Sequence, residues 1–263
     1  MTSDPAAIDA HAHLGSGFRP WRTEDLAADL VATSAEVGIG RSLVSTLGTR
    51  SLLDHPGPAE LRAANEITTA AIARFPAALA GVVYLSPEHP RASLDELNRH
   101  VADGRFVGVK LWIAVRANDI RLDPLVERMC ELGVPLLQHA WYKTVGATPG
   151  ESTPADVAEL ARRHPDLRIQ MAHLGGAGKR GVAEIGPHPN IVVDTSGGDP
   201  VLGEVDHAVA QLGAERVIFG SDAPIRDPAT ALAKVLGTRL GEPERRLVLR
   251  ENALRVYRRL AAS

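Results

Sequence analysis

The stretch Ala7-Ile8-Asp9-Ala10-His11-Ala12-His13 is a short apolar run that ends in two histidines. Comparable runs recur about every thirty residues, with helical patterns between them, at residues 41–47, 80–85, 107–113, 135–141, 167–174, 191–196 and 216–222. Several are continuously apolar, as expected for parallel strands that are covered on both faces. Eight such units in one chain predict an α/β fold, a (β/α)8 TIM barrel.

The segments between the runs carry the end signals of helices. Thr23 is expected to cap a helix that Gly38 ends, and a final helix is expected over roughly residues 242–262. An oxygen-bearing residue followed by proline, which suits a helix N-terminus, occurs at Asp123-Pro124, Thr153-Pro154 and Asp227-Pro228. No linker or low-complexity tract interrupts the pattern, so residues 1–263 are expected to form one domain.

The chief alternative to a barrel is an open, doubly wound sheet. No Gly-x-Gly-x-x-Gly turn follows the first apolar run, so a dinucleotide-binding fold lacks support. The glycine-rich segment 175–178 follows the sixth run, but it is not a Walker sequence. We interpret that segment as a loop that lines a pocket.

Composition narrows the class of protein. The chain of 263 residues is 44% hydrophobic and has a formal net charge of −3, which gives no basic footprint for nucleic acid. Cys130 is the single cysteine, which excludes an internal disulfide framework and fits a reducing compartment. No signal peptide is evident, and no apolar run is long enough to span a bilayer. These features predict a soluble, cytoplasmic protein that binds neither nucleic acid nor membrane.

Five side chains that can bind a metal lie at the ends of predicted strands: His11, His13, His139, His173 and Asp222. In a closed parallel barrel these strand ends open onto one face, where active sites lie. His11 and His13 are two residues apart in a strand, so their side chains point to the same face. Imidazole and carboxylate together suit Zn²⁺ and related divalent ions. A metal would also partner the buried charge of Asp222, which could in addition accept a proton.

Each of these residues has a structural alternative. His11 and His13 could be two hydrogen-bonded core histidines, and Asp222 could cap a helix, although Asp227 already supplies that cap. The remaining histidines precede prolines or lie on helical segments. We interpret them as surface residues: His55, His89, His100, His164, His188 and His207.

Lys110 lies inside the predicted strand 107–113, where alternation puts it on the same face as Gly108 and Trp112. A lysine inside a strand is unusual. It could pair with a carboxylate, contact an anionic substrate, or be carbamylated and bridge two metals. We rank the first two roles above carbamylation.

The loops that follow the strands should form the rim of a pocket. All three tryptophans of a chain with only 4% aromatic residues fall in or beside these loops. Apolar walls with a few polar groups are typical of a ligand site, and arginine suits a carboxylate. Packing at the barrel top is the alternative for two of the tryptophans, and segment 145–150 is interpreted as a lid. The predicted substrate contacts are Lys110, Trp112, Trp141, Arg19, Trp21 and Tyr142.

Taken together, these motifs resemble the metal-dependent amidohydrolase superfamily, and within it the amidohydrolase 2 branch. That branch includes aminocarboxymuconate-semialdehyde decarboxylase-like and lactonase-like enzymes. The resemblance covers nearly the whole chain and rests on His139 and on residues 9–13, 108–111, 172–176, 220–222 and 250–255.

The resemblance implies one divalent ion per chain, with Zn²⁺ preferred and Mn²⁺ as the alternative. The implied ligands are His11, His13, His139 and Asp222. His173 would be a nearby acid, base or carbonyl-polarising group, and Lys110 would be unmodified.

For the reaction, the sequence favours hydrolysis. Many aromatic-acid decarboxylases of the family carry glutamate at the first motif histidine, whereas this chain keeps His11 and lacks long insertions. We predict a metal-dependent hydrolase of a small cyclic ester (a lactone) or amide that bears a carboxylate, with Asp222 and His173 as catalytic residues. The first alternative is a nonoxidative decarboxylase of an aromatic or unsaturated carboxylic acid, and the second is a catalytically silent barrel that binds a small molecule. The sequence is compatible with a homodimer.

Overall fold

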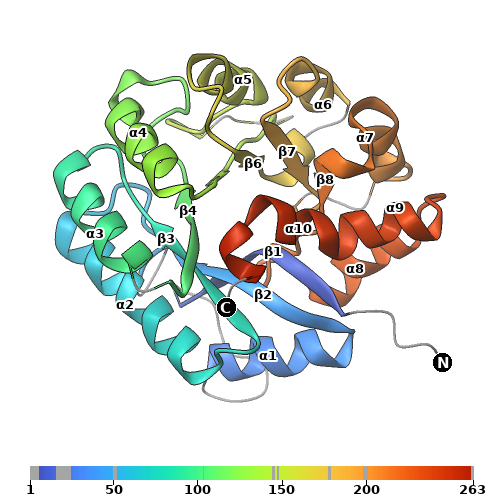
Figure 1. The fold of residues 1–263 in the computed structure, drawn as a ribbon, viewed down its shortest axis with the longest axis horizontal. Helices are drawn as coiled ribbons and strands as arrows, with labels where there is room; N and C mark the ends of the chain where they lie inside the picture. Colours follow the sequence, from blue (N-terminus) through green and yellow to red (C-terminus); the bar gives the residue numbers. More distant parts are fainter. Residues whose placement is uncertain are drawn as a thin grey trace.

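Eight parallel strands form one sheet in the order β1 to β8, with the helices arranged around it (Figure 1). A computed structural model describes residues 6–15, 25–49, 52–102, 104–143, 146, 148–176, 179–197 and 201–261. The strands are β1 (Ala7–Leu14), β2 (Ile39–Thr46), β3 (Leu79–Tyr84), β4 (Phe106–Leu111), β5 (Leu136–Gln138), β6 (Ile169–Met171), β7 (Ile191–Asp194) and β8 (Val217–Ile218).

The ring closes where the chain after β8 meets β1. The amide of Ala10 donates to the carbonyl of Phe219 at 2.9 Å, and the amide of Asp222 donates to the carbonyl of His11 at 2.7 Å. Beside them, the Ser221 hydroxyl donates to the buried carboxyl of Asp9 at 2.5 Å. Burial raises the pKa of Asp9 to about 6, although its hydrogen bonds oppose the shift. This closure confirms the predicted (β/α)8 barrel and excludes the open sheet.

Both faces of the strands are buried, which explains why the sequence shows continuous apolar runs. Val82 and Val192 face the barrel interior, whereas Val83 and Val193, one residue further along, belong to the outer core under the helices. Neighbouring strands are in parallel register, with Gln138 of β5 opposite Met171 of β6. The residues that follow these two strands therefore leave the sheet side by side, at the carboxyl end of the barrel.

Ten α-helices are described: α1 (Leu26–Glu36), α2 (Pro58–Arg74), α3 (Pro90–Ala102), α4 (Asp123–Leu132), α5 (Pro154–Arg163), α6 (Arg180–Ile185), α7 (Glu204–Leu212), α8 (Pro228–Leu236), α9 (Glu242–Arg246) and α10 (Asn252–Val256). Predicted caps are confirmed at Thr153, which accepts from the amide of Asp156, and at Asp227. Within the described part of the chain, no helix is long and apolar enough to cross a lipid bilayer.

Three predicted helix features differ from the structure. Asp123 is the first residue of α4 and not its cap. Helix α1 begins after Asp25, whose carboxylate accepts from the amide of Ala28 at 3.1 Å, and Thr23 lies outside the described residues. Residues 242–262 do not form one helix, because a π-helical turn (Leu247–Glu251) separates α9 from α10. The Asn252 side chain, which donates at 2.7 Å to two main-chain carbonyls before and within β8, anchors the segment where the helix changes.

His100 is buried, so its assignment to the surface is wrong. Its side chain lies on the face of α3 that packs on α2, with Nε2 3.1 Å from the Glu96 carboxylate. Glu96 also accepts from Asn65 at 3.2 Å and from Arg62 at 3.0 Å. Helical periodicity alone did not separate this polar contact between two helices from a solvent-facing position. Of the other five histidines assigned to the surface, His55 is exposed and the rest are half-buried.

We expect Glu96→Ala to lower the free energy of unfolding by about 2–3 kcal/mol, because it removes the buried carboxylate that accepts from the Asn65 amide and bonds Nε2 of His100. Burial raises the pKa of Glu96, but Arg62, Asn65 and His100 lower it below its ordinary value. Its stabilisation is therefore present above the pKa of an unfolded glutamate and is lost as the pH falls through the lower folded value. Chemical denaturation at neutral and acid pH measures both effects.

The matched control is Glu66→Ala. Glu66 pairs with Arg99 on the surface of α2 and is 45% exposed. An exposed pair of this kind contributes less than about 1 kcal/mol. Equal losses for the two variants would contradict the structural role of Glu96.

Candidate active site

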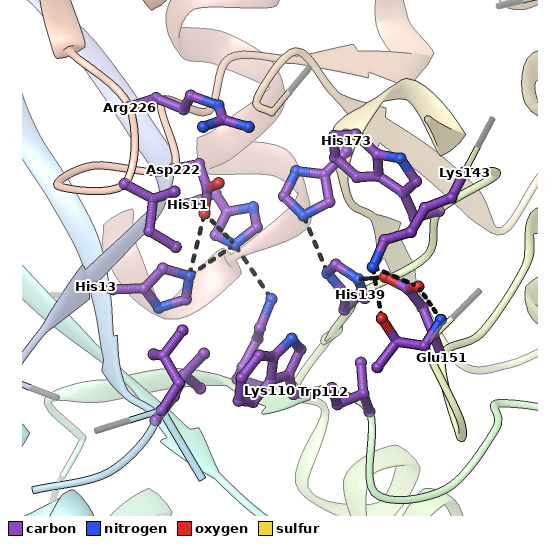
Figure 2. Close-up of a pocket in the computed structure, with 16 residues that line it drawn as sticks. His11, His13, Lys110, Trp112, His139, Lys143, Glu151, His173, Asp222 and Arg226 are labelled. Carbon is purple, nitrogen blue, oxygen red and sulfur yellow. Dashed lines mark hydrogen bonds and ion pairs between the residues drawn. The ribbon is translucent and has the colours of Figure 1, made fainter. Parts of the chain in front are cut away.

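The five predicted metal-binding side chains line one cavity of about 280 Å³ at the carboxyl end of the barrel (Figure 2). His11 and His13 come from β1, while the other three follow β5, β6 and β8 directly or within a few residues. Residues far apart in the sequence therefore meet at one place, as their positions at strand ends predicted.

His11, His13 and Asp222 form a tight group. The Nε2 atoms of the two histidines are 3.1 Å apart. Oδ1 of Asp222 lies 3.3 Å from Nε2 of His13 and 3.7 Å from Nε2 of His11. Ligands that sit tetrahedrally about 2.0–2.1 Å from one Zn²⁺ are roughly 3.3–3.4 Å from each other. The three side chains therefore have the spacing of ligands that share one ion.

Hydrogen bonds on the far side of each ring support this assignment. Nδ1 of His11 lies 3.0 Å from a carboxylate oxygen of Asp194. Nδ1 of His13 lies 3.1 Å from the hydroxyl of Ser45 and 3.4 Å from its main-chain carbonyl. The Asp194 carboxylate and the Ser45 carbonyl can only accept and the Ser45 hydroxyl can accept, so these partners favour a hydrogen on each Nδ1 and a lone pair on each Nε2. Two lone pairs and the carboxylate of Asp222 then converge, an arrangement that needs a cation between them. The donor set fits a divalent metal ion.

Lys110 supplies one positive charge to this group. Its side chain is buried on the interior face of β4, as alternation predicted, and Nζ lies 3.1 Å from Nε2 of His11. The neighbouring atom is thus an imidazole nitrogen rather than the carboxylate that simple pairing would supply. Burial lowers the pKa of Lys110 to about 8, while the charges of Asp222 and Asp194 act in the opposite direction.

His139 and His173 form a second pair, with Nδ1 of His139 3.1 Å from Nε2 of His173. His173, His11 and Asp222 each offer one ligand atom within 4.8 Å of the others. Nε2 of His139 is 2.8 Å from Glu151. The structure thus brings His173 close to the centre, whereas the resemblance implied a ligand role for His139 and a role beside the metal for His173. Both roles remain predictions.

The backbone is strained at two of these residues. His173 has φ 67° and Asp222 has φ 63°, a left-handed conformation that is uncommon for residues other than glycine. Such conformations cost about 1–3 kcal/mol each and cluster at active sites. β8 covers only Val217–Ile218, so it is shorter than the predicted strand over 216–222. Gly197 packs against the His173 ring so closely that any side chain there would overlap Nδ1.

Two carboxylates of the site were missed in the sequence. Asp194 ends β7 and, besides His11, accepts from the main-chain amide of His173 at 2.9 Å. Although burial acts to raise the pKa of Asp194, the charges of His11 and His173 hold it well below its ordinary range. An acid at the end of an apolar run is the same signal that identified Asp222, so Asp194 was predictable. Glu151 lies in a loop without periodic pattern and gave no such signal.

Glu151 joins the site to its rim. It accepts from His139 and, at 3.0 Å, from Lys143. Burial raises the pKa of Glu151, but these two partners lower it to about 2, so the side chain is a buried carboxylate. This contact fixes which nitrogen of His139 carries a hydrogen and leaves Nδ1 facing His173.

The cavity has apolar walls and a charged rim. Trp112 and Trp141 line it, as predicted, and Trp141 stacks on His139 with ring centroids 6.4 Å apart. Tyr142 does not line it, because the main chain there bridges to Gly176 and the Tyr142 ring lies under the Arg180 guanidinium, 4.5 Å from it. The other lining residues that bear on binding are Leu47, Leu52, Ile113, Ile225, Lys143 and Arg226.

Three predictions fall on undescribed residues. Arg19 and Trp21, which were expected to contact substrate, lie outside the described residues. The segment 145–150, interpreted as a lid, includes positions 145 and 147, which also lie outside them.

The sequence model of the amidohydrolase family matches residues 8–259. The chain therefore belongs to the amidohydrolase family. No curated protein matches the sequence.

Solved structures share the fold over almost their whole length. The 5-carboxyvanillate decarboxylase of Sphingomonas paucimobilis has a TM-score of 0.74 and 18% identity, over 97% of this chain and 99% of that one. A dihydroxybenzoic acid decarboxylase of Polaromonas, with bound manganese and the inhibitor 2-nitroresorcinol, has a TM-score of 0.76 and 17% identity, over 97% of each chain. The 4-oxalomesaconate hydratase of Rhodopseudomonas palustris has a TM-score of 0.73 and 19% identity, over 97% of each chain. At these identities the likeness establishes the fold alone.

Proposed function

We propose that this protein is a metal-dependent decarboxylase that removes CO₂, without oxidation, from a small aromatic or unsaturated carboxylic acid. The sequence favoured hydrolysis and held decarboxylation as the alternative. The similar solved structures described above are two decarboxylases and a hydratase, which supports the alternative.

One observation carries the proposal: the cavity combines indole walls, cationic groups and the carboxylate of Asp222. Trp112 and Trp141 offer flat apolar surfaces, and Lys110 and Arg226 add positive charge that suits an acid. The volume of about 280 Å³ lies near the lower end of small-molecule sites, which span roughly 300–1,000 Å³. A single ring or a short unsaturated chain fits these limits.

Decarboxylation breaks the bond between the carboxyl carbon and its neighbour. The electron pair stays on the neighbouring carbon, CO₂ leaves, and a proton takes its place. A bound divalent ion would supply a Lewis acid for the substrate oxygens. The residues of the chain hold the ring against the indole walls, exclude water and deliver the proton. Asp222 is the first candidate for the proton carrier and Nε2 of His173 is the second, since both face the cavity (Figure 2).

The metal is proposed as one ion per chain. The imidazole-rich donor set of His11, His13 and Asp222 favours Zn²⁺, whereas the Polaromonas structure carries manganese. A small-molecule substrate is part of the same proposal.

Hydrolysis of a lactone is the second candidate. It is favoured by one observation: the first motif keeps His11, where many aromatic-acid decarboxylases of the family carry glutamate. The two reactions use water differently, which makes them separable by isotope.

The test is a panel of hydroxybenzoic acids, unsaturated dicarboxylic acids and carboxylated lactones, given to protein loaded with Zn²⁺ or with Mn²⁺. If the protein is a decarboxylase, CO₂ is released and the product carries one deuterium from D₂O at the carbon that held the carboxyl group. The product incorporates no ¹⁸O from labelled water. Uptake of ¹⁸O by an opened lactone, with no CO₂ from any acid, would establish hydrolysis and reject the proposal.

We expect Arg226→Gln to raise KM for the acid about tenfold and to leave kcat nearly unchanged, because a charge that binds substrate and transition state alike affects KM alone. The Arg226 guanidinium lies above Asp222 at the cavity (Figure 2), and no carboxylate within the described ranges pairs with it. Steady-state kinetics measure the effect. Arg91→Gln, on the exposed surface of α3, is the control. A fall in kcat with unchanged KM would contradict a binding role.

A further inference from the structure

The C-terminal segment reaches into the barrel from the end opposite the cavity. Tyr257, which follows α10, is fully buried and belongs to the apolar cluster of the barrel interior (Figure 1 shows α10 across this part of the barrel). A Cβ on Gly108 of β4 would lie 2.7 Å from the Tyr257 ring. Glycine at position 108 therefore makes room for this ring, although Gly108 itself lines no part of the cavity.

Hydrogen bonds connect the Tyr257 hydroxyl to the candidate metal centre. The hydroxyl lies 2.6 Å from Oε1 of Gln170 on β6. Nε2 of Gln170 lies 2.7 Å from Oδ2 of Asp194, and the same oxygen lies 3.0 Å from Nδ1 of His11. All four side chains have zero exposure, so water does not compete for these contacts.

Each link has only one direction. Burial raises the pKa of Tyr257 well above its ordinary value, so the hydroxyl keeps its proton and donates to Oε1. The Gln170 amide group then faces Asp194 and the main-chain carbonyl of Ala10, at 3.2 Å, both of which can only accept. A flipped Gln170 would put its oxygen against two acceptors and its NH₂ against the hydroxyl. The hydroxyl thus fixes the amide, the amide holds the Asp194 carboxylate, and the carboxylate holds His11.

We propose that Tyr257 and Gln170 are positioning residues for the metal centre: they hold Asp194 so that His11 directs its Nε2 lone pair at the ion. The proposal rests on the metal site of the proposed function and is independent of the reaction catalysed there. It gives the C-terminal segment a part in the site, although that segment lies at the other end of the barrel.

The expected effects follow from the distance of each residue from the ion. Removing a group that holds a metal-binding histidine typically costs about 10- to 100-fold in metal affinity. Gln170 acts through Asp194, so Gln170→Met, which keeps the length of the side chain, is expected to weaken affinity about tenfold. Tyr257→Phe removes only the first donor of the series, and an effect of about fivefold is expected.

The experiment measures Zn²⁺ and Mn²⁺ affinity of metal-free protein by competition with a chelator, for Tyr257→Phe, Gln170→Met and the double variant. Because Tyr257 acts through Gln170, the double variant should bind metal no more weakly than Gln170→Met alone. The absorption spectrum of bound Co²⁺ should shift in the same variants, since it reports the ligand geometry. Tyr84→Phe is the control: its buried hydroxyl donates to the carbonyl of Leu53 at 2.7 Å and has no link to His11.

Thermal unfolding without metal separates positioning from general loosening. Tyr257→Phe and Tyr84→Phe are expected to lose similar stability, with lower metal affinity in the first alone. Equal affinities in these two variants, or losses that add in the double variant, would show that Tyr257 only packs and would overturn the proposal. Wild-type protein that binds neither ion would overturn the metal site and this proposal together. Wild-type protein that binds metal but releases no CO₂ from any acid would overturn the proposed reaction alone.

Discussion

Asp222→Asn should lower turnover about 10³-fold in protein that still holds a metal ion, within the 10²- to 10⁴-fold range of a lost general acid or base. The carboxylate faces the cavity, 3.3 Å from Nε2 of His13. Asparagine keeps an oxygen that can bind a cation but has no proton to give or take at that oxygen. Activity should therefore fall much further than metal content, and both are measured on the same preparation.

The control makes the same chemical change five residues later. Asp227 caps α8 with its side chain and is exposed, and asparagine is an equally good cap, so Asp227→Asn should leave turnover and stability unchanged. Near-normal turnover of Asp222→Asn with metal bound would show that Asp222 does not carry the proton. His173, with Nε2 in the same cavity, would then be the first candidate.

The barrel and much of its site could be predicted because they depend on local patterns that repeat. A buried parallel strand appears in the sequence as a continuous apolar run. A polar residue at its C-terminal end lies on the face of the barrel where all the strands end. This reasoning places His11, His173 and Asp222 at one cavity, as the structure confirms. The same reasoning applied to the run that ends at Asp194 would have found the carboxylate that holds His11.

Contacts between distant segments were beyond this reasoning. Glu151 belongs to a loop, and its position against His139 depends on the path of that loop rather than on any period. The link from Tyr257 to Gln170 joins residues 87 positions apart across the barrel interior. The sequence pattern of α3 places His100 on the helix surface, but α2 packs against that surface and buries it. In each case the environment of the side chain depends on a segment distant in the sequence and not on the local pattern around the residue.

Which of His139 and His173 lies nearer to Asp222 depends on the rotation of the two side chains, which no sequence pattern specifies. His139 and His173 follow adjacent strands that are in register, so either ring could turn toward Asp222. The hydrogen bond to Glu151 fixes the position of Nε2 of His139. Gly197 has no side chain, which leaves room for the His173 ring. Replacing each histidine in turn therefore distinguishes the possible ligand sets.

His13→Ala should weaken metal affinity by more than about 100-fold, a larger loss than removal of a group that only supports a ligand. Its Nε2 is 3.1 Å from that of His11, and burial lowers the pKa of His13 to about 4, so the ring is neutral and its lone pair is free near pH 7. His55→Ala is the control, since that side chain is 61% exposed and lies 2.9 Å from the Glu88 carboxylate. Chelator competition with Zn²⁺ and Mn²⁺ measures the affinities.

The same assay on His139→Ala and His173→Ala distinguishes two ligand sets. If His13→Ala and His139→Ala lose the metal while His173→Ala keeps it, the ion is held as the family resemblance implies. If His13→Ala binds metal almost normally and His173→Ala does not, the ion is held by His11, His173 and Asp222, whose ligand atoms lie within 4.8 Å of each other. In that case the ring nitrogen of His173 that binds the ion cannot also carry the proton, whereas Asp222 has a second carboxylate oxygen that can.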